Sequence, residues 1–436
     1  MGVSPPTLLA AGFLGLILVG TLLLALPFSG RSASLGMFEA LFTATAAVTI
    51  TGLSIIEPGQ LSFFGQAVII VLAQIGGLGF VTFAVVSAIT LGNRMSLRQQ
   101  SLALEAFNQT STARLRSIAV SVIRITVVIE LSAMLLLFLW WWGSGRLPVT
   151  TALFQAILHA VAAFNNFGYA FLEDSLASFV GDGVTIGILS CVVILGGIGF
   201  PIIVEIMRKK RWQALAPYVR LILISTAIMN LLGFAGIWLL EAGNPLTLGA
   251  LGWADQGRAA WMQSISLRTA GFTVFDVQYM DDSTTLFAAM FMFIGGGSMS
   301  TAGGVKLGTF VVILAAVFAY VTQRKEVVLM RRTISPDIIQ KALAVVVVTV
   351  LAAALALLVL TILEDVAFVS LMLEVVAALS TTGISQSLTA ELSRPSQCVL
   401  LLLMFMGRVG PLTLVYSLAT RSRSRIRYPE MDFQVG

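Results

Sequence analysis

Several apolar runs in this sequence are long enough to cross a lipid bilayer, among them 8–26, 67–91 and 342–363. About 20 apolar residues in a helix span the hydrocarbon core of a membrane. Only 11% of the residues are charged, against about 25% in soluble domains, so a soluble fold of this size is excluded. The first run lacks a basic start and a clear cleavage site, so we expect a retained helix rather than a signal peptide.

Most basic residues gather in four clusters, and the connections between these clusters are richer in acidic residues. Cytoplasmic loops of membrane proteins carry an excess of Lys and Arg, so we place the clusters in the cytoplasm. Each cluster adjoins a membrane-length run, which makes nucleic-acid binding a poor alternative. The clusters hold 18 of the 26 Lys and Arg residues: Arg94, Arg98, Arg114 and Arg116; Arg208, Lys209, Lys210, Arg211 and Arg220; Arg324, Lys325, Arg331, Arg332 and Lys341; Arg421, Arg423, Arg425 and Arg427.

Between successive basic clusters the chain must cross the membrane an even number of times. We therefore predict an all-α membrane protein with eight transmembrane helices and both termini in the cytoplasm. The expected spanning helices lie near 7–27, 61–91, 118–142, 183–206, 218–240, 284–322, 340–363 and 397–420.

The four outer connections resemble one another. Each contains a short, mildly apolar segment followed by a motif with a key glycine; the segments are 38–48, 151–164, 258–267 and 370–380, and the key glycines are Gly52, Gly168, Gly271 and Gly383. The key glycines lie 116, 103 and 112 residues apart, a period that indicates internal duplication. We therefore expect four parallel repeats, at 1–92, 93–210, 211–325 and 326–436, the last with a short basic cytoplasmic tail.

A second glycine recurs after each key glycine. Gly76, Gly295 and Gly407 lie 24 residues after the key glycine of their repeat, and Gly196 lies 28 residues after it. The surrounding residues of the first two repeats match closely, as 76–80 reads GGLGF and 196–200 reads GGIGF. This second match supports the same fourfold division.

The short segments, of about 10–14 residues, are too short to span a bilayer and fit re-entrant half-helices. Non-helical backbone at membrane depth must be buried in protein or line a watery cavity. Four such loops would surround one central pore, where backbone carbonyls can replace the water around a potassium ion. Glycine permits positive φ without steric cost, and the partly negative C-terminal ends of the half-helices favour a cation. The alternative is that the glycines only allow close helix packing.

The predicted potassium filter consists mainly of backbone carbonyls from the four motifs. The Thr and Asn side chains in them either line the pathway or bond to the loop backbone. Arg268 is expected to be an outer structural anchor, paired with a nearby carboxylate, that contributes only its carbonyl. The filter residues are Thr49, Ile50, Thr51 and Gly52; Asn165, Asn166, Phe167 and Gly168; Arg268, Thr269, Ala270 and Gly271; Ser380, Thr381, Thr382 and Gly383.

A gate is predicted below the filter, where the sixth apolar run is interrupted by 295–304. Five glycines in ten residues should break the helix, since each costs about 1 kcal/mol in a helix interior. Arg408 lies within the last apolar run, and a charge there usually marks a transport pathway. It either repels cations or holds the glycine-rich loop by bonding its carbonyls. The gate residues are Gly295, Gly296, Gly297, Ser298, Gly303, Gly304, Lys306 and Arg408.

These motifs resemble those of the Trk/Ktr/HKT superfamily of potassium transporters, over nearly the whole chain. Eight spans without an extra N-terminal pair look more like its bacterial KtrB branch than the longer TrkH type. The segments that carry the resemblance are 48–53 (VTITGL), 164–168 (FNNFG), 267–272 (LRTAGF), 380–383 (STTG), 300–306 (STAGGVK) and 407–411 (GRVGP). Phe167 replaces a smaller residue usual in the second loop, and Met299 stands where glycine is frequent.

The resemblance implies potassium uptake across the bacterial cytoplasmic membrane by a homodimer with one pore per subunit. It implies a cytosolic KtrA-like nucleotide-binding ring that regulates the gate, so a nucleotide acts only through this partner. K⁺ is the substrate, Na⁺ is a possible activator, and no covalent cofactor or enzyme activity is expected.

Two other functions are open to a chain of this composition. A secondary carrier with broken helices would be built from inverted repeats, which parallel repeats disfavour. An intramembrane protease would need a catalytic partner for His159, the single histidine, and the sequence offers no evident serine motif. Cys191 and Cys398 lie in apolar runs, where we expect buried free thiols and neither a disulfide framework nor a metal site.

Overall fold

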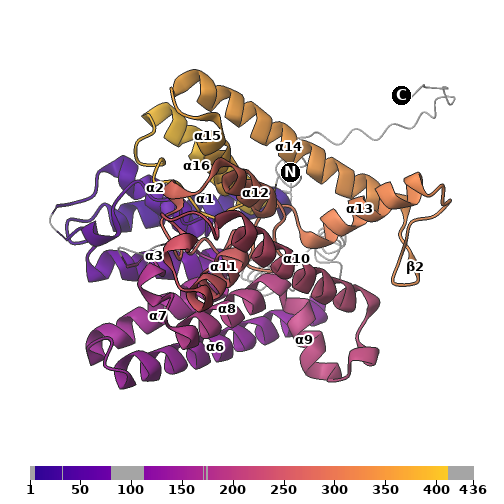
Figure 1. Ribbon diagram of the computed structural model, residues 1–436, viewed down its shortest axis with the longest axis horizontal. Coiled ribbons are helices and arrows are strands. Elements are labelled where there is room, and N and C mark those ends of the chain that lie inside the picture. Colours follow the sequence, from indigo (N-terminus) through magenta and orange to yellow (C-terminus); the bar gives the residue numbers. More distant parts are fainter. Residues whose placement is uncertain (1–4, 32, 80–111, 170, 173–174, 411–436) are drawn as a thin grey trace.

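The computed structural model describes residues 5–31, 33–79, 112–169, 171–172 and 175–410 (Figure 1). Almost every regular element in them is helical. The helices are α1 (Pro5–Leu24), α2 (Met37–Val48), α3 (Phe63–Gly77), α6 (Thr112–Gly143), α7 (Val149–Asn165), α8 (Gly183–Ile198), α9 (Phe200–Lys209), α10 (Pro217–Glu241), α11 (Trp253–Leu267), α12 (Asp282–Phe293), α13 (Leu307–Val321), α14 (Pro336–Leu363), α15 (Phe368–Leu379) and α16 (Arg394–Val409). The strands β1 (Val328–Leu329) and β2 (Arg332–Thr333) pair antiparallel between α13 and α14, a small departure from the all-α expectation.

Local sequence signals start several of these helices. Ser62 precedes α3, and its side chain accepts a hydrogen bond from the backbone nitrogen of Gly65 at 3.1 Å. The Asp182 carboxylate accepts one from the backbone nitrogen of Val184 at 3.1 Å at the start of α8. Such caps satisfy backbone donors that have no partner inside the helix. Proline occupies the first turn of α10, α14 and α16, where its missing N–H costs nothing.

The short helices α2, α7, α11 and α15 lie inside the molecule, whereas the long helices expose apolar side chains. The C-terminal parts of α2 and α15 are buried in protein. By contrast, Leu239 of α10 is 83% exposed and Ile362 of α14 is 74% exposed. A soluble protein does not leave so many large apolar side chains uncovered. In Figure 1, α6 and α14 lie at opposite edges of the view, with α11 between them.

Three helices in the described residues are long and apolar enough to cross a membrane: 120–143, 217–241 and 336–363. A fourth candidate is the pair α8 and α9, which meet at a bend of 101°. The helix expected over 183–206 is therefore broken into two parts. Gly199 separates the two halves with φ of 104°, a conformation that only glycine adopts readily.

The short helices pack in a cyclic order. Each lies against the helix that follows the preceding short helix and its loop: α7 against α3, α11 against α8, and α15 against α12. The order closes because α2 packs against α16, near the other end of the chain. Segments far apart in sequence therefore surround a common centre.

Two further expectations concern the cysteines and the ends of several helices. Both cysteines are free, but each is exposed on the outer face of its helix, so the expectation of burial is wrong. An apolar helix can turn such a face toward lipid instead of protein. The expected helix ends beyond Leu78 and Gly410 lie largely outside the described residues, as do Phe80, Pro411, Arg94, Arg98 and the basic cluster 421–427.

Candidate functional site

Each key glycine follows the C-terminus of a short helix, and the four resulting loops meet. We name them motif loops 1 to 4: residues 49–53, 165–169, 268–272 and 380–385. A Cβ atom placed on any key glycine would come within 3.0 Å of the backbone of the next loop. Gly52 faces Gly168, Gly168 faces Gly271, Gly271 faces Thr382, and Gly383 faces Thr51. The four backbones thus form a closed ring in which side chains at these positions have no space.

The motif loops share an unusual backbone conformation. The residue two positions before each key glycine has positive φ: 52° at Ile50, 53° at Asn166, 76° at Thr269 and 52° at Thr381. Positive φ is uncommon outside glycine, above all for β-branched residues, and such strain clusters at ligand-binding and active sites. Three key glycines also have positive φ, but Gly168 is not among them. The expectation that glycine supplies positive φ in every loop is therefore wrong for motif loop 2, where close contact alone requires glycine.

Hydroxyl groups of motif loops 1 and 4 bond locally. The hydroxyl of Thr49 donates to the carbonyl of Thr45 at 2.7 Å and pairs with the Thr51 hydroxyl at 2.8 Å. Ser380 and Thr382 pair in the same way at 2.8 Å. These pairs occupy hydroxyls of motif loops 1 and 4, whereas the hydroxyls of Thr269 and Thr381 are buried without a hydrogen-bond partner among the described residues.

Asn165 and Arg268 make longer-range contacts. The Asn165 amide nitrogen lies within hydrogen-bond distance of Gln74 Oε1 at 2.5 Å, of the Val161 carbonyl at 2.9 Å and of Glu130 Oε1 at 3.3 Å, and its two hydrogens are shared among these three acceptors. Arg268 is buried, and its Nη1 donates to Asn230 Oδ1 at 2.9 Å. The expected carboxylate partner of Arg268 is wrong within the part of the chain that the structure describes, because the amide of Asn230 takes that place.

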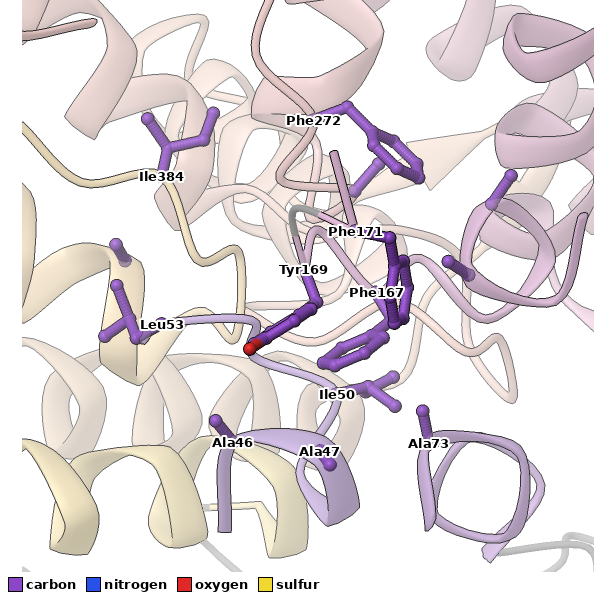
Figure 2. Close-up of a cluster of buried hydrophobic side chains, with 14 of the residues drawn as sticks. Ala46, Ala47, Ile50, Leu53, Ala73, Phe167, Tyr169, Phe171, Phe272 and Ile384 are labelled. Carbon is purple, nitrogen blue, oxygen red and sulfur yellow. The ribbon is translucent and has the colours of Figure 1, made fainter. Parts of the chain in front are cut away.

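Aromatic side chains pack behind motif loop 2, away from the ring of glycines. The Phe167 ring stacks on Tyr169 with centroids 5.7 Å apart, and Tyr169 meets Phe171 at 5.2 Å. Figure 2 shows these three rings together, with Ile50 of motif loop 1 beside Phe167. Phe167 and Ile50 are fully buried. Their large side chains therefore belong to the hydrophobic core.

The predicted helix break near Gly295 is present. Residues 294–306 form an irregular segment between α12 and α13 and lie against the end of α8. The backbone nitrogen of Gly297 donates to the carbonyl of Gly197 at 2.8 Å, and that of Phe200 donates to the carbonyl of Met299 at 3.2 Å. A Cβ on Gly199 would approach the carbonyl oxygen of Ser298 at 2.5 Å. The bend between α8 and α9 thus accommodates this segment.

Arg408 holds the 294–306 segment from the opposite side. Its Nη1 donates to the carbonyl of Thr301 at 2.7 Å, and its Nη2 donates to the carbonyls of Gly76 at 2.6 Å and Gly77 at 2.9 Å. Lys306 donates to the carbonyl of Ala302. The guanidinium group therefore joins α16, the end of α3 and the irregular segment, as one of the two sequence-based alternatives requires.

The second set of glycines allows the helix after a motif loop to touch the end of the short helix before that loop. Gly76, Gly196 and Gly407 lie against the carbonyls of Val48, Phe164 and Leu379, each four residues before a key glycine. Gly295 instead lies against Gly303 of the 294–306 segment. Three repeats therefore share one contact, and the third differs where its helix is broken.

Sequence reasoning missed Glu130, Gln74 and Asn230. Glu130 is an acidic residue inside an apolar run, and an ionisable residue at membrane depth is itself a signal of function. The described residues contain no group of three or more His, Cys, Asp or Glu side chains that could hold a metal ion.

Comparison with protein families finds one match over most of the chain. The model of the TrkH family, described as cation transport protein, matches residues 9–424. The match includes all four motif loops and the 294–306 segment.

Individual relatives are similar over almost their entire length. "Ktr system potassium uptake protein B" of Bacillus subtilis is 39% identical, covering 99% of this chain and 97% of that protein. The protein of the same name from Vibrio alginolyticus is 38% identical, covering 98% and 93%. "Potassium/sodium uptake protein NtpJ" of Enterococcus hirae is 31% identical, covering 99% and 97%. The crystal structure of the potassium transporter TrkH from Vibrio parahaemolyticus has the same fold, with a TM-score of 0.69 at 20% identity, covering 94% of this chain and 85% of that one.

Proposed function

This chain belongs to the TrkH family of cation transport proteins, and on that premise we propose how it carries potassium ions through a membrane. It is a potassium uptake transporter of the Ktr/Trk type and not an enzyme. An intramembrane protease and an organic-solute carrier are therefore set aside.

The ion filter of this proposal is the ring of motif loops. The observation that carries it is the cyclic contact of Gly52, Gly168, Gly271 and Gly383 through neighbouring backbones. Four loops at one level bring carbonyls from four directions toward one point, which is the arrangement that replaces the hydration shell of potassium. The eight-helix architecture with four re-entrant half-helices follows the same proposal, with the half-helices α2, α7, α11 and α15 ending at the filter.

The gate of this proposal is the 294–306 segment together with Arg408. The support is the set of three guanidinium hydrogen bonds that join Thr301 to Gly76 and Gly77. Release of these bonds would loosen an irregular segment that is otherwise held by hydrogen bonds of Thr301 and Gly297 to the ends of α7 and α8.

Assembly and regulation are proposed from the relatives. We infer a homodimer in the bacterial cytoplasmic membrane, with both termini in the cytoplasm and a KtrA-like nucleotide-binding ring as the regulator. The name of the Bacillus relative, "Ktr system", indicates more than one component. Activation by sodium is a further part of the proposal, and the Enterococcus relative is named for potassium and sodium.

The filter is tested by changing each key glycine to serine and measuring potassium uptake, with sodium as competitor, in cells that lack other potassium uptake systems. We expect reduced preference for potassium in Gly52→Ser, Gly168→Ser, Gly271→Ser and Gly383→Ser, because each added Cβ displaces a neighbouring backbone. Gly187→Ser is the control, since a Cβ at Gly187 of α8 meets no described residue within 4 Å. Unchanged preference in all four variants would overturn the filter.

A further inference from the structure

The motif loops are supported in two different ways. The comparison concerns the residue three positions before each key glycine: Thr49, Asn165, Arg268 and Ser380. In motif loops 1 and 4 this residue pairs its hydroxyl with that of Thr51 or Thr382, two positions later. Motif loops 2 and 3 have Phe167 and Ala270 at that later position, so the same pair cannot form.

Motif loops 2 and 3 are supported instead from the long helix that begins their repeat. Asn165 donates to Glu130 of α6 at 3.3 Å, and Arg268 donates to Asn230 of α10 at 2.9 Å. Glu130 and Asn230 are both buried. In both repeats, a buried polar side chain on the long helix accepts a hydrogen bond from the residue three positions before the key glycine.

The support of motif loop 2 is the more extensive. Gln74, Glu130 and Asn165 form the Asn165 cluster, in which Gln74 Nε2 also donates to Glu130 Oε2 at 3.1 Å. The amide of Asn165 lies where a Cβ on Gly77 would be. Gly77 in turn accepts a hydrogen bond from Arg408. A buried carboxylate that receives donors from two helices holds both in place, because leaving it unpaired is costly.

We propose that Glu130 is a positioning residue that determines ion discrimination, because it fixes motif loop 2 through Asn165. This inference rests on the proposed filter. Discrimination between K⁺ and Na⁺ depends on how many carbonyls coordinate the ion and how firmly they are held. Motif loop 2 has neither the hydroxyl pair of loops 1 and 4 nor a key glycine with positive φ. Its carbonyls therefore depend on the Asn165 cluster more than those of the other loops.

The test compares uptake of radioactive Rb⁺, with Na⁺ as competitor, in wild type and three variants, normalised to the transporter present in the membrane. Glu130→Ala should lower the preference for Rb⁺ over Na⁺ by about tenfold, the size expected for one lost hydrogen bond to a charged group. Glu130→Gln keeps the shape and one acceptor oxygen, and should retain most of the preference. The control is Thr126→Val, one turn earlier on α6, since the Thr126 hydroxyl is buried and has no hydrogen-bond partner in the part of the chain that the structure describes.

The outcomes separate the inference from the function on which it rests. Wild type that shows no preference for Rb⁺ over Na⁺ would overturn the proposed filter. Wild-type preference that survives in Glu130→Ala, or falls equally in Thr126→Val, would overturn the role of Glu130 alone. If Glu130→Ala does not reach the membrane, Gln74→Met carries the same test, because it removes another member of the Asn165 cluster and should also lower the preference.

Discussion

Glycine is required in the motif loops for two reasons that act at different residues. Gly52, Gly271 and Gly383 combine positive φ with close contact, whereas Gly168 is required by its contact with Gly271 alone. The sequence was sufficient to predict that the backbone of the motif loops requires glycine at these positions. It did not reveal the positive φ of Ile50 and Thr381, because a β-branched residue is the least expected there.

Single polar residues were harder to place than glycines. Arg408 was predicted from its charge inside an apolar run, and the structure shows which carbonyls it bonds. The partner of Arg268 was predicted as a carboxylate but is Asn230, on another helix. Such pairs depend on how helices pack, and a sequence read along one chain does not show which helix faces which.

Arg408→Ala should raise the maximal rate of potassium uptake without changing ion preference. The guanidinium group donates one hydrogen bond to Thr301 of the 294–306 segment and two to Gly76 and Gly77 at the end of α3, which ties the segment to that helix. Hydrogen bonds to charged groups are each worth about 1.5–3 kcal/mol. Loss of even one would shift the gate equilibrium by about tenfold. The measurement is the initial rate of K⁺ uptake per transporter.

Arg394→Ala on the same helix is the matched control, since Arg394 lies at the surface over the Phe38 ring, 4.4 Å from its centroid. It should transport at the wild-type rate. An Arg408→Ala variant with wild-type rates and a correct amount in the membrane would remove Arg408 from the gate.

At the scale of elements, the short helices and the break near Gly295 were predicted closely, and the bend at Gly199 was not. The segments 38–48 and 370–380 correspond to α2 at Met37–Val48 and α15 at Phe368–Leu379. Helix α11 begins at Trp253, earlier than the expected 258, because polar residues of its first turn hid the helix from an apolar pattern. The bend at Gly199 escaped prediction because its cause, the 294–306 segment, lies about 100 residues away in the chain.

Gly199→Ala tests whether the bend between α8 and α9 seats the 294–306 segment. A Cβ there would meet the Ser298 carbonyl at 2.5 Å, and the φ of 104° suits only glycine. We expect a local strain of about 1–3 kcal/mol, a displaced segment, and faster K⁺ uptake at unchanged ion preference. Gly187→Ala on α8 is the control, because nothing lies within 4 Å of a Cβ there. Equal K⁺ uptake rates in Gly199→Ala and Gly187→Ala would contradict the proposal that the bend holds the 294–306 segment in place.

At the scale of the whole molecule, four unlike motif loops close into a ring. The period of the key glycines predicted four units, but their order in space follows from contacts between helices, among them that of α2 with α16. Because one chain supplies all four loops, each loop can be supported differently, as the hydroxyl pairs and the contacts of Glu130 and Asn230 show. A symmetric ring of identical subunits could not vary its loops in this way.

Anomalous X-ray diffraction from crystals grown in Rb⁺ measures directly where the ion binds. The account predicts a Rb⁺ peak enclosed by the ring of Gly52, Gly168, Gly271 and Gly383, within coordination distance of backbone carbonyls from all four motif loops. A bound ion coordinated elsewhere, with that ring filled by protein atoms alone, would contradict it.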